Sequence, residues 1–301
     1  MKKIVITLVS LAVAFTAMAQ PQGMGPQGQR PPMGQRPQGG PQGGMPRMTY
    51  VEKEVYSGPD VIIRQIDEHT WQGNGHMMAN ECIYIIEGND RALLIDAGTK
   101  IDDLDKIVAG ITSKPVTLMA THVHPDHTGE SIKYFDQIYI NAADMVSVPS
   151  MMGDYKGEIK YLNDGEIIDL GGREIEVIFA PGHTPGSTIY FDKEKHYGFS
   201  GDAFGSGNLL LTTNFSTLLN TTTRIAAYMR KYGIEKMYPG HYMGSNPETL
   251  ERVENMKKMC EEMLDGTRKG NVQQGGGMMG LNASVRDFGV NINYRDPDGL
   301  K

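Results

Sequence analysis

The order of strand-like and helix-like segments predicts an α/β fold for this chain. Short runs that alternate apolar and polar residues, or that are wholly apolar, are typical of strands, and amphipathic runs with a helical period lie between them. Strands that alternate with helices build sheets covered by helices. About 250 residues follow a low-complexity start, which is enough for one large layered domain.

The individual elements follow from local patterns. Residues 52–99 have the alternation and the turn residues of strands, and residues 101–111 predict a helix because their apolar residues recur on one helix face. Asn246 is a good N-cap, and Pro247 suits the first position of a helix that runs to about residue 264. The other predicted elements are a short helix over residues 128–135, a helix over 216–232, a flexible stretch over 266–280 and a strand over 284–294.

The first 19 residues have the features of a secretory signal. Two lysines precede an apolar run over residues 4–15, and Ala17-Met18-Ala19 before Gln20 supplies the small residues of a cleavage site. The run is too short to span a bilayer comfortably, and no cysteine follows the cleavage site for a lipid anchor. We therefore expect export in a bacterium, to the periplasm or beyond, without a stable membrane anchor.

Residues 20–47 contain only Gln, Pro, Gly, Met and Arg, a composition that cannot bury a core. We expect a disordered spacer there, then the main domain over residues 48–265 and a Gly/Met-rich loop and strand extension over 266–301. The formal net charge of −7 becomes −12 for residues 48–301, because five basic residues and no acidic ones precede them. An acidic body disfavours a nucleic-acid partner, so the expected partner is a small-molecule substrate.

The two cysteines lie in different settings. Cys82 falls in an apolar strand and Cys260 in a helical stretch. They could pair in an oxidising compartment, but two buried free thiols fit these settings better, and neither has a metal-ligand spacing.

The most informative stretch is residues 121–129. It holds three of the chain's eight histidines, His122, His124 and His127, together with Asp126, directly after the apolar run 116–120. Imidazole nitrogen and carboxylate oxygen are ligands that suit zinc and iron. A surface patch could share this composition, so the positions of the other histidines decide between the two interpretations.

Further ligand types recur in one setting downstream. His183, Asp202 and His241 each follow a strand-like run and fall at a glycine-containing turn. Glycine lets the backbone bend sharply near a bound group, and loops at strand ends can converge on one point. Four strand ends that offer five histidines and two aspartates predict a metal site, although Asp202 alone could simply close a turn.

On these residues the chain resembles the metallo-β-lactamase superfamily. The motif His-x-His-x-Asp-His stands at residues 122–127, and later landmarks stand at 182–186, 200–202 and 240–241. Segments 80–88 and 92–98 resemble the first strand pair of the family, so the resemblance covers roughly residues 55–245. It implies an αββα sandwich, in which two mixed sheets pack face to face with helices outside and metals at one edge. This fold hosts many chemistries, so the substrate stays open.

The resemblance, with its glyoxalase II-like ligand set, implies two adjacent metal sites. Asp96 would orient a ligand histidine, or would only cap the turn before Gly98. The expected cations are two Zn²⁺, with iron as the alternative. The first site would be formed by His122, His124 and His183 and the second by Asp126, His127 and His241, with Asp202 bridging the two.

Two such cations would turn a shared water into a hydroxide nucleophile, since one zinc already lowers the pKa of its water to about 7. They would also polarise a carbonyl and stabilise the oxyanion, while Asp126 could position the hydroxide. The sequence has no Gly-x-Ser-x-Gly elbow and no cysteine in a catalytic setting. The prediction is an exported hydrolase of an ester, thioester, lactone or amide.

Substrate contacts are less sharply marked. His76 lies in a loop of the kind that overhangs the metals in this superfamily, and it either faces substrate or is an ordinary loop residue. Tyr242, beside His241, is a candidate oxyanion donor. Several methionines would suit a hydrophobic substrate or could be plain core residues: Met77, Met78, Met151, Met152 and Met243.

Three alternatives stand beside the zinc hydrolase. A β-lactamase would suit an exported enzyme, although those branches generally lack the bridging aspartate that stands here as Asp202. A persulfide dioxygenase would use one iron held by two histidines and an aspartate, and a non-catalytic surface protein would use the 20–47 arm. The C-terminal region departs from glyoxalase II-like enzymes, because a single helix and a Gly/Met-rich tail stand where those carry a helical substrate domain.

Overall fold

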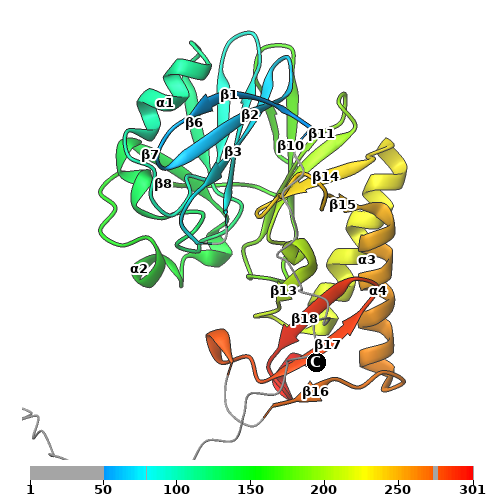
Figure 1. Cartoon of the computed structure of the whole chain (residues 1–301). Coiled ribbons are helices and arrows are strands. Elements are labelled where there is room, and N and C mark those ends of the chain that lie inside the picture. Colours follow the sequence, from blue (N-terminus) through cyan, green and yellow to red (C-terminus); the bar gives the residue numbers. More distant parts are fainter. Residues whose placement is uncertain (1–50, 79, 274–276, 301) are drawn as a thin grey trace, which may run out of the picture. The chain divides into compact units, whose positions relative to one another are not determined.

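Two mixed β-sheets packed face to face form the centre of the protein (Figure 1), which a computed structural model describes for residues 51–78, 80–273 and 277–300. The expected signal at 1–19 and spacer at 20–47 lie outside the described residues. In the first sheet the strands up to β5 are antiparallel and those from β5 onward are parallel. The order is β1 (Lys53–Ser57), β2 (Val61–Asp67), β3 (Thr70–Gly75), β4 (Cys82–Glu87), β5 (Ala92–Ile95), β6 (Val116–Met119), β7 (Gln137–Ile140) and β8 (Glu158–Tyr161).

The second sheet is antiparallel except where β12 and β14 run side by side in parallel. Its inner face packs on the first sheet through aromatic side chains, and the rings of Tyr84 and Phe199 lie 4.9 Å apart between their centroids. The order is β15 (Glu248–Thr249), β14 (Lys236–Pro239), β12 (Tyr197–Gly201), β11 (Thr188–Asp192), β10 (Glu174–Phe179) and β9 (Ile167–Asp169).

Helices cover the outer face of each sheet. Leu104 and Val108 of α1 (Leu104–Ile111) and Ile132 of the 3₁₀ helix η1 (Glu130–Tyr134) pack on the first sheet, on the side where α2 (Val148–Met151) also lies. The 3₁₀ helix η2 (Ala142–Asp144) precedes α2 in the chain. The second sheet is covered by α3 (Phe215–Tyr232) and α4 (Leu250–Asp265). The predicted αββα sandwich is confirmed.

A third, smaller sheet extends the second helical layer. Val285, Ile292 and Tyr294 share a core with α3 and α4. The single strand predicted over 284–294 is wrong: the chain turns back at Phe288 and Gly289, whose φ values of 49° and 73° are those of a tight hairpin turn. The sheet consists of β13 (Asn208–Leu210), β18 (Val290–Tyr294), β17 (Ala283–Asp287) and β16 (Asn271–Val272), with the 3₁₀ turns η3 (Gly205–Gly207), η4 (Met278–Gly280) and η5 (Asp298–Leu300) around it.

The helix ends test the capping predictions. The helix predicted over 216–232 is confirmed as α3, where the Asn214 side chain accepts a hydrogen bond from Thr217 N. The predicted start of the last helix is wrong, because Glu248 and Thr249 pair with β14 and keep the chain extended until Thr249 caps α4. Asn246 instead accepts a hydrogen bond from Met243 N.

The cysteines are both free and buried, as expected: Cys82 lies between the sheets and Cys260 under the second helical layer. Among the described residues, no helix has the length and apolar character that a membrane span requires.

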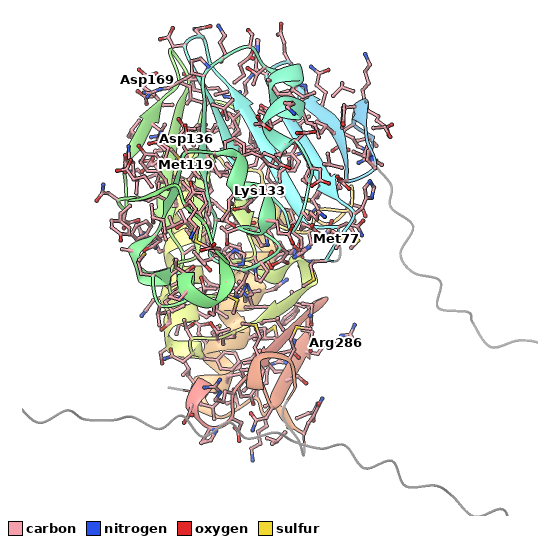
Figure 2. The ribbon with its side chains drawn as sticks, turned by 90° about the vertical axis from the view of Figure 1, so that its left-hand side faces the viewer. Met77, Met119, Lys133, Asp136, Asp169 and Arg286 are labelled. Carbon is pink, nitrogen blue, oxygen red and sulfur yellow. The ribbon has the colours of Figure 1, made fainter. Side chains whose placement is uncertain are left out.

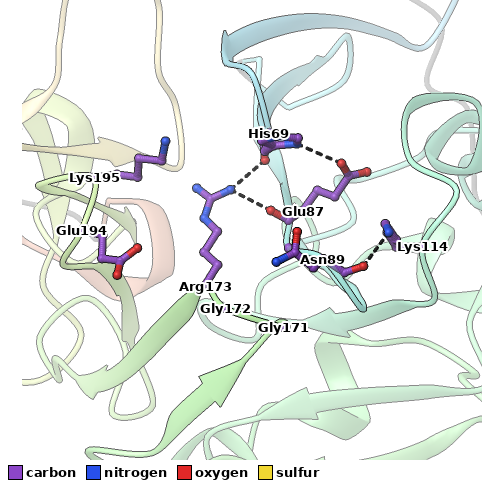
Figure 3. A pocket seen from close by; sticks show the side chains of 10 residues that line it. His69, Glu87, Asn89, Lys114, Gly171, Gly172, Arg173, Glu194 and Lys195 are labelled. Atoms are coloured by element: carbon purple, nitrogen blue, oxygen red, sulfur yellow. Dashed lines mark hydrogen bonds and ion pairs between the residues drawn. The ribbon is translucent and has the colours of Figure 1, made fainter.

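Arg173 joins the two sheets at the edge formed by the β4–β5 and β11–β12 turns. Its Nε donates to the buried Asp192 at 2.7 Å, and its side chain is 8% exposed. Figure 3 shows the guanidinium between the backbone carbonyls of His69 and Glu87, beside a pocket of about 270 Å³. All five N–H groups have acceptors: Asp192 Oδ2, His69 O, Glu87 O, Thr70 Oγ1 and the Tyr197 hydroxyl.

Replacement of Arg173 by Met should lower the free energy of unfolding by roughly 3–5 kcal/mol, because it leaves the Asp192 carboxylate buried without its partner. Urea denaturation at neutral pH measures the loss. The double variant Arg173→Met, Asp192→Asn should recover part of it, since the uncompensated charge is then gone. A loss below about 1 kcal/mol in the single variant would contradict a supporting role for this ion pair.

Candidate metal centre

Strand direction brings the predicted ligands to one edge of the sandwich. Because β5 and β6 are parallel, Asp96 and residues 121–127 leave the first sheet at the same edge. β10, β12 and β14 share one direction in the second sheet, so His183, Asp202 and His241 all follow strand ends there. Thr188 N donates to Thr121 O at 2.8 Å and connects the two sets of loops.

Three imidazole nitrogens converge in the first part of the site. His124 Nδ1 lies 3.0 Å from His122 Nε2 and 2.9 Å from His183 Nε2. All three side chains are buried. A neutral imidazole has only one N–H donor, so three ring nitrogens that converge cannot all form hydrogen bonds with one another. A cation at the point of convergence would accept their lone pairs and stabilise the arrangement.

A second group lies beside the first. The ligand atoms of Asp126, His127 and His241 lie within 4.8 Å of one another, and His241 Nε2 is 3.4 Å from Asp126 Oδ2. Asp202 faces both groups. Its Oδ2 lies 3.8 Å from His183 Nε2 and 3.4 Å from His241 Nε2, while its Oδ1 lies 3.7 Å from His127 Nε2.

Two buried atoms of the site test whether a metal fits. Among the described residues, His127 Nε2 and Asp202 Oδ1 have no hydrogen-bond partner. A buried polar atom left unpaired costs about 1–3 kcal/mol, so each such atom needs an explanation. A cation would supply the missing partner of both, and a set of imidazoles and carboxylates has the donor chemistry of a zinc site. The residues therefore fit divalent cations.

The electrostatics divide the histidines into two kinds. Burial lowers the pKa of His122 and His183, and brings that of His124 down to about 4, so these rings are neutral and offer lone pairs. Burial also opposes the charge on His127, but Asp96 and Asp126 outweigh it and raise the pKa of His127 to about 9.

The two carboxylates of the site are ionised. Burial raises the pKa of Asp126, yet the neighbouring His127 and His241 prevail and hold it at about 2. The pKa of Asp202 is likewise held well below its usual range, because the attraction of His241 and His127 exceeds the cost of burial. A metal ligand must be deprotonated, and both aspartates meet this requirement at neutral pH.

Asp96 holds His127 in position. Its Oδ2 accepts from His127 Nδ1 at 2.7 Å and from the Thr121 hydroxyl at 2.8 Å, while Oδ1 accepts from Thr121 N. This bond turns His127 Nε2 toward the centre, which is the contact expected of a residue that orients a ligand. The backbone of Asp96 is left-handed, with φ 61°, a costly conformation that gathers at functional sites.

Asp144 is a supporting residue that the sequence analysis missed. Its carboxylate is buried and accepts from Val123 N at 3.0 Å, from the Thr184 hydroxyl at 2.9 Å and from Gly186 N at 2.7 Å. It therefore ties the loop of His122 and His124 to the loop of His183. Burial raises the pKa of Asp144 in spite of these bonds. Its position just after the alternating run 137–140 is the one sequence signal that could have found it.

The structure brings together all seven predicted ligands. The two residues predicted to contact substrate, His76 and Tyr242, lie in different environments. His76 is exposed on the loop after β3. Tyr242 packs in the core between the sheets, 5.3 Å from the Tyr238 ring, and its hydroxyl bonds to Glu52 and to Gly244 O. These contacts explain the position of Tyr242 by packing, so the suggestion of an oxyanion donor has no support from its hydroxyl.

The comparison with protein families decides the identity of the fold. Residues 82–241, just over half of the chain, match the description "Metallo-beta-lactamase superfamily". The chain belongs to the metallo-beta-lactamase superfamily. All seven converging residues lie within the matched range. The solved structures agree on the fold: a metallo-beta-lactamase from Pontibacter korlensis has a TM-score of 0.52 and 17% identity, covering 67% of this chain and 99% of that one.

Curated relatives within this superfamily are named as hydrolases. An acyl-coenzyme A thioesterase MBLAC2 of Gallus gallus is 26% identical over 212 residues, covering 57% of this chain and 76% of its own. A hydroxyacylglutathione hydrolase of Synechococcus sp. (strain JA-3-3Ab) is 29% identical over 132 residues, covering 42% and 49%. The family match and these relatives together identify this superfamily member as a metal-dependent hydrolase.

Replacement of Asp144 by Asn should lower metal affinity roughly 10–100-fold, because the amide cannot accept all three hydrogen bonds that fix the two ligand loops. Competition with a chromogenic chelator measures the affinity. Asp154→Asn, an exposed carboxylate of the same segment, is the matched control and should bind metal as the wild type does. Equal affinities in the two variants would remove Asp144 from the support of the site.

Proposed function

We propose that the protein hydrolyses an acyl thioester at a centre of two divalent cations, with zinc as the expected metal. The observation that carries the proposal is the position of Asp202, whose two oxygens face ligands of both groups. The first cation would be held by His122, His124 and His183, the second by Asp126, His127 and His241, and Asp202 would be shared.

When bound, cations at this place supply Lewis acidity toward a carbonyl oxygen and lower the pKa of a water. The protein's own residues supply orientation. His127 is turned by Asp96, and His183 Nδ1 is fixed by the carbonyl of Leu210 at 2.8 Å. Asp126 keeps its carboxylate ionised, so it can accept a hydrogen bond from a water and orient that water toward a carbonyl carbon.

The protonation of the site favours a good leaving group. Asp126 and Asp202 are both ionised, and the histidines that bind metal must be neutral. None of the seven residues is then a protonated acid for the leaving group. A thiolate leaves without a proton far more readily than an amine or an alkoxide, since a thiol has a pKa of about 8.5. A thioester is therefore the best match among the carbonyl substrates.

The relatives support the same substrate class. Two of them are named for the removal of acyl groups from coenzyme A and from glutathione, and both carriers are thiols. The likeness to a β-lactamase structure at 17% identity speaks for the fold alone. Imidazole and carboxylate donors also accept iron, so metal content is measured in the same experiment.

Hydrolysis of S-acyl N-acetylcysteamine thioesters should fall roughly 10²-fold or more in Asp126→Ala, because a metal ligand and the group that orients the water are lost together. Asp136→Ala, an exposed carboxylate labelled in Figure 2, should keep full activity. Elemental mass spectrometry should find about two zinc per wild-type chain. Efficient turnover of a chromogenic cephalosporin with no thioester cleavage would overturn the substrate class, and a single bound iron would overturn the dizinc centre.

We also infer that the protein is exported, from the leader pattern of residues 1–19. Expression of the full chain in a bacterium, followed by fractionation and N-terminal sequencing, should recover a chain that begins at Gln20 outside the cytoplasm. A cytoplasmic chain that keeps Met1 would contradict export.

A further inference from the structure

We infer that the acyl part of the substrate lies in a pocket beside the loop that carries Asp126. We call it the acyl pocket: a cavity of about 480 Å³ whose apolar lining comes from Pro125, Ile132, Met151, Met152 and Tyr155. This inference rests on the proposed function and adds to it the location and the chain-length preference of the acyl site.

The acyl pocket adjoins the loop that carries candidate ligands of both groups. Pro125 lines the pocket, is exposed, and stands between the candidate ligands His124 and Asp126. Gly129 lines the pocket too, and a side chain there would collide with the carbonyl oxygens of Thr99 and Pro125. The pocket lining is therefore adjacent in the chain to two candidate ligands, and in the arrangement we infer the acyl chain passes over Pro125 from a carbonyl at the metal centre.

The lining has the character of a site for an alkyl chain. Ile132 and Met152 are nearly fully buried, 2% and 4% exposed, and form a fixed floor between η1 and α2. Met151 is half-buried, and an unbranched thioether side chain adapts to ligands of different length. Charge is confined to exposed residues, among them Lys133 in Figure 2 and Asp154. The volume lies in the range of small-molecule sites.

The same edge of the sandwich carries other exposed apolar side chains. Met77 and Met78 are 52% and 55% exposed on the loop after β3, which is joined to the loop of His241 by the hydrogen bond from Cys82 N to Gly240 O. Met145 and Val146 are exposed directly after Asp144, on the segment that leads into the acyl pocket. Exposed apolar side chains on two loops around one centre are typical of a site for an apolar ligand.

The polar pocket beside Arg173 does not compete for this role. It lies at the opposite ends of the strands, and His69, Glu87, Lys114 and Lys195 contribute to its lining. A charged and polar lining does not favour the burial of an alkyl chain. An acyl chain whose carbonyl is bound at the metal centre would also have to cross the sandwich to enter this pocket.

The test fills and enlarges the acyl pocket. In the wild type, kcat/KM for saturated S-acyl N-acetylcysteamine thioesters should rise roughly fourfold per added methylene until the pocket is full. Met151→Trp and Ser150→Trp should lower the value about tenfold or more for long chains and less than about twofold for the acetyl compound. Met151→Ala should move the optimum to longer chains. Gly110→Trp, in an open position on α1, is the matched control and should change nothing.

A binding measurement separates this inference from the proposed function. Calorimetry with S-alkyl N-acetylcysteamine thioethers, which cannot be hydrolysed, should show affinity that rises with chain length and falls in Met151→Trp and Ser150→Trp. If thioethers bind in this way but no thioester is cleaved, the acyl pocket stands and the proposed reaction fails. If thioesters are cleaved but neither tryptophan variant changes the chain-length dependence of kcat/KM or the affinity for thioethers, the acyl pocket is wrong and the reaction stands. A change of oligomeric state in these variants, with an unaltered chain-length profile, would assign the surface to a second copy and overturn the inference.

Discussion

The close approach of seven ionisable side chains is the constraint on which the rest of the structure depends. Five imidazoles and two carboxylates meet at one partly buried place, and His127 Nε2 and Asp202 Oδ1 find no partner among the described residues. Each such atom costs about 1–3 kcal/mol until a cation binds. The fold must hold the rings against this cost. It does so through ring atoms that point away from the centre, as with Asp96 on His127 and the Leu210 carbonyl on His183.

The two edges of the sandwich differ in how completely their buried polar groups are hydrogen-bonded. At one edge Arg173 satisfies all five of its donors and joins the turns of both sheets. At the other edge the strands end in loops whose polar atoms are left for a ligand. A fully satisfied buried network rigidifies its surroundings, whereas unsatisfied groups mark the place where binding supplies the missing interactions.

The sequence predicted the part of this arrangement that is local. The motif at residues 122–127 and the glycine turns at His183, Asp202 and His241 carry their own signals, because a strand end followed by a sharp turn is visible without knowledge of the neighbours. Asp144 was missed because its role exists only through groups far along the chain, such as Gly186 N and the Thr184 hydroxyl. The start of α4 was misplaced for the same reason, since pairing with β14 overrides the capping preference of Asn246.

The C-terminal sheet shows how a tertiary contact changes the meaning of a segment. From the sequence alone, residues 266–301 are a glycine- and methionine-rich tail. Glyoxalase II-like enzymes carry a helical substrate domain in the corresponding region. In the fold, β18 pairs in parallel with β13, and Leu210 of β13 accepts the hydrogen bond from His183 Nδ1. The hydroxyl of Thr212, two residues further on, donates to His183 O. A backbone carbonyl can fix an imidazole only if its own strand is fixed. The C-terminal hairpin pairs with that strand, so the tail supports a predicted metal ligand from outside the sandwich.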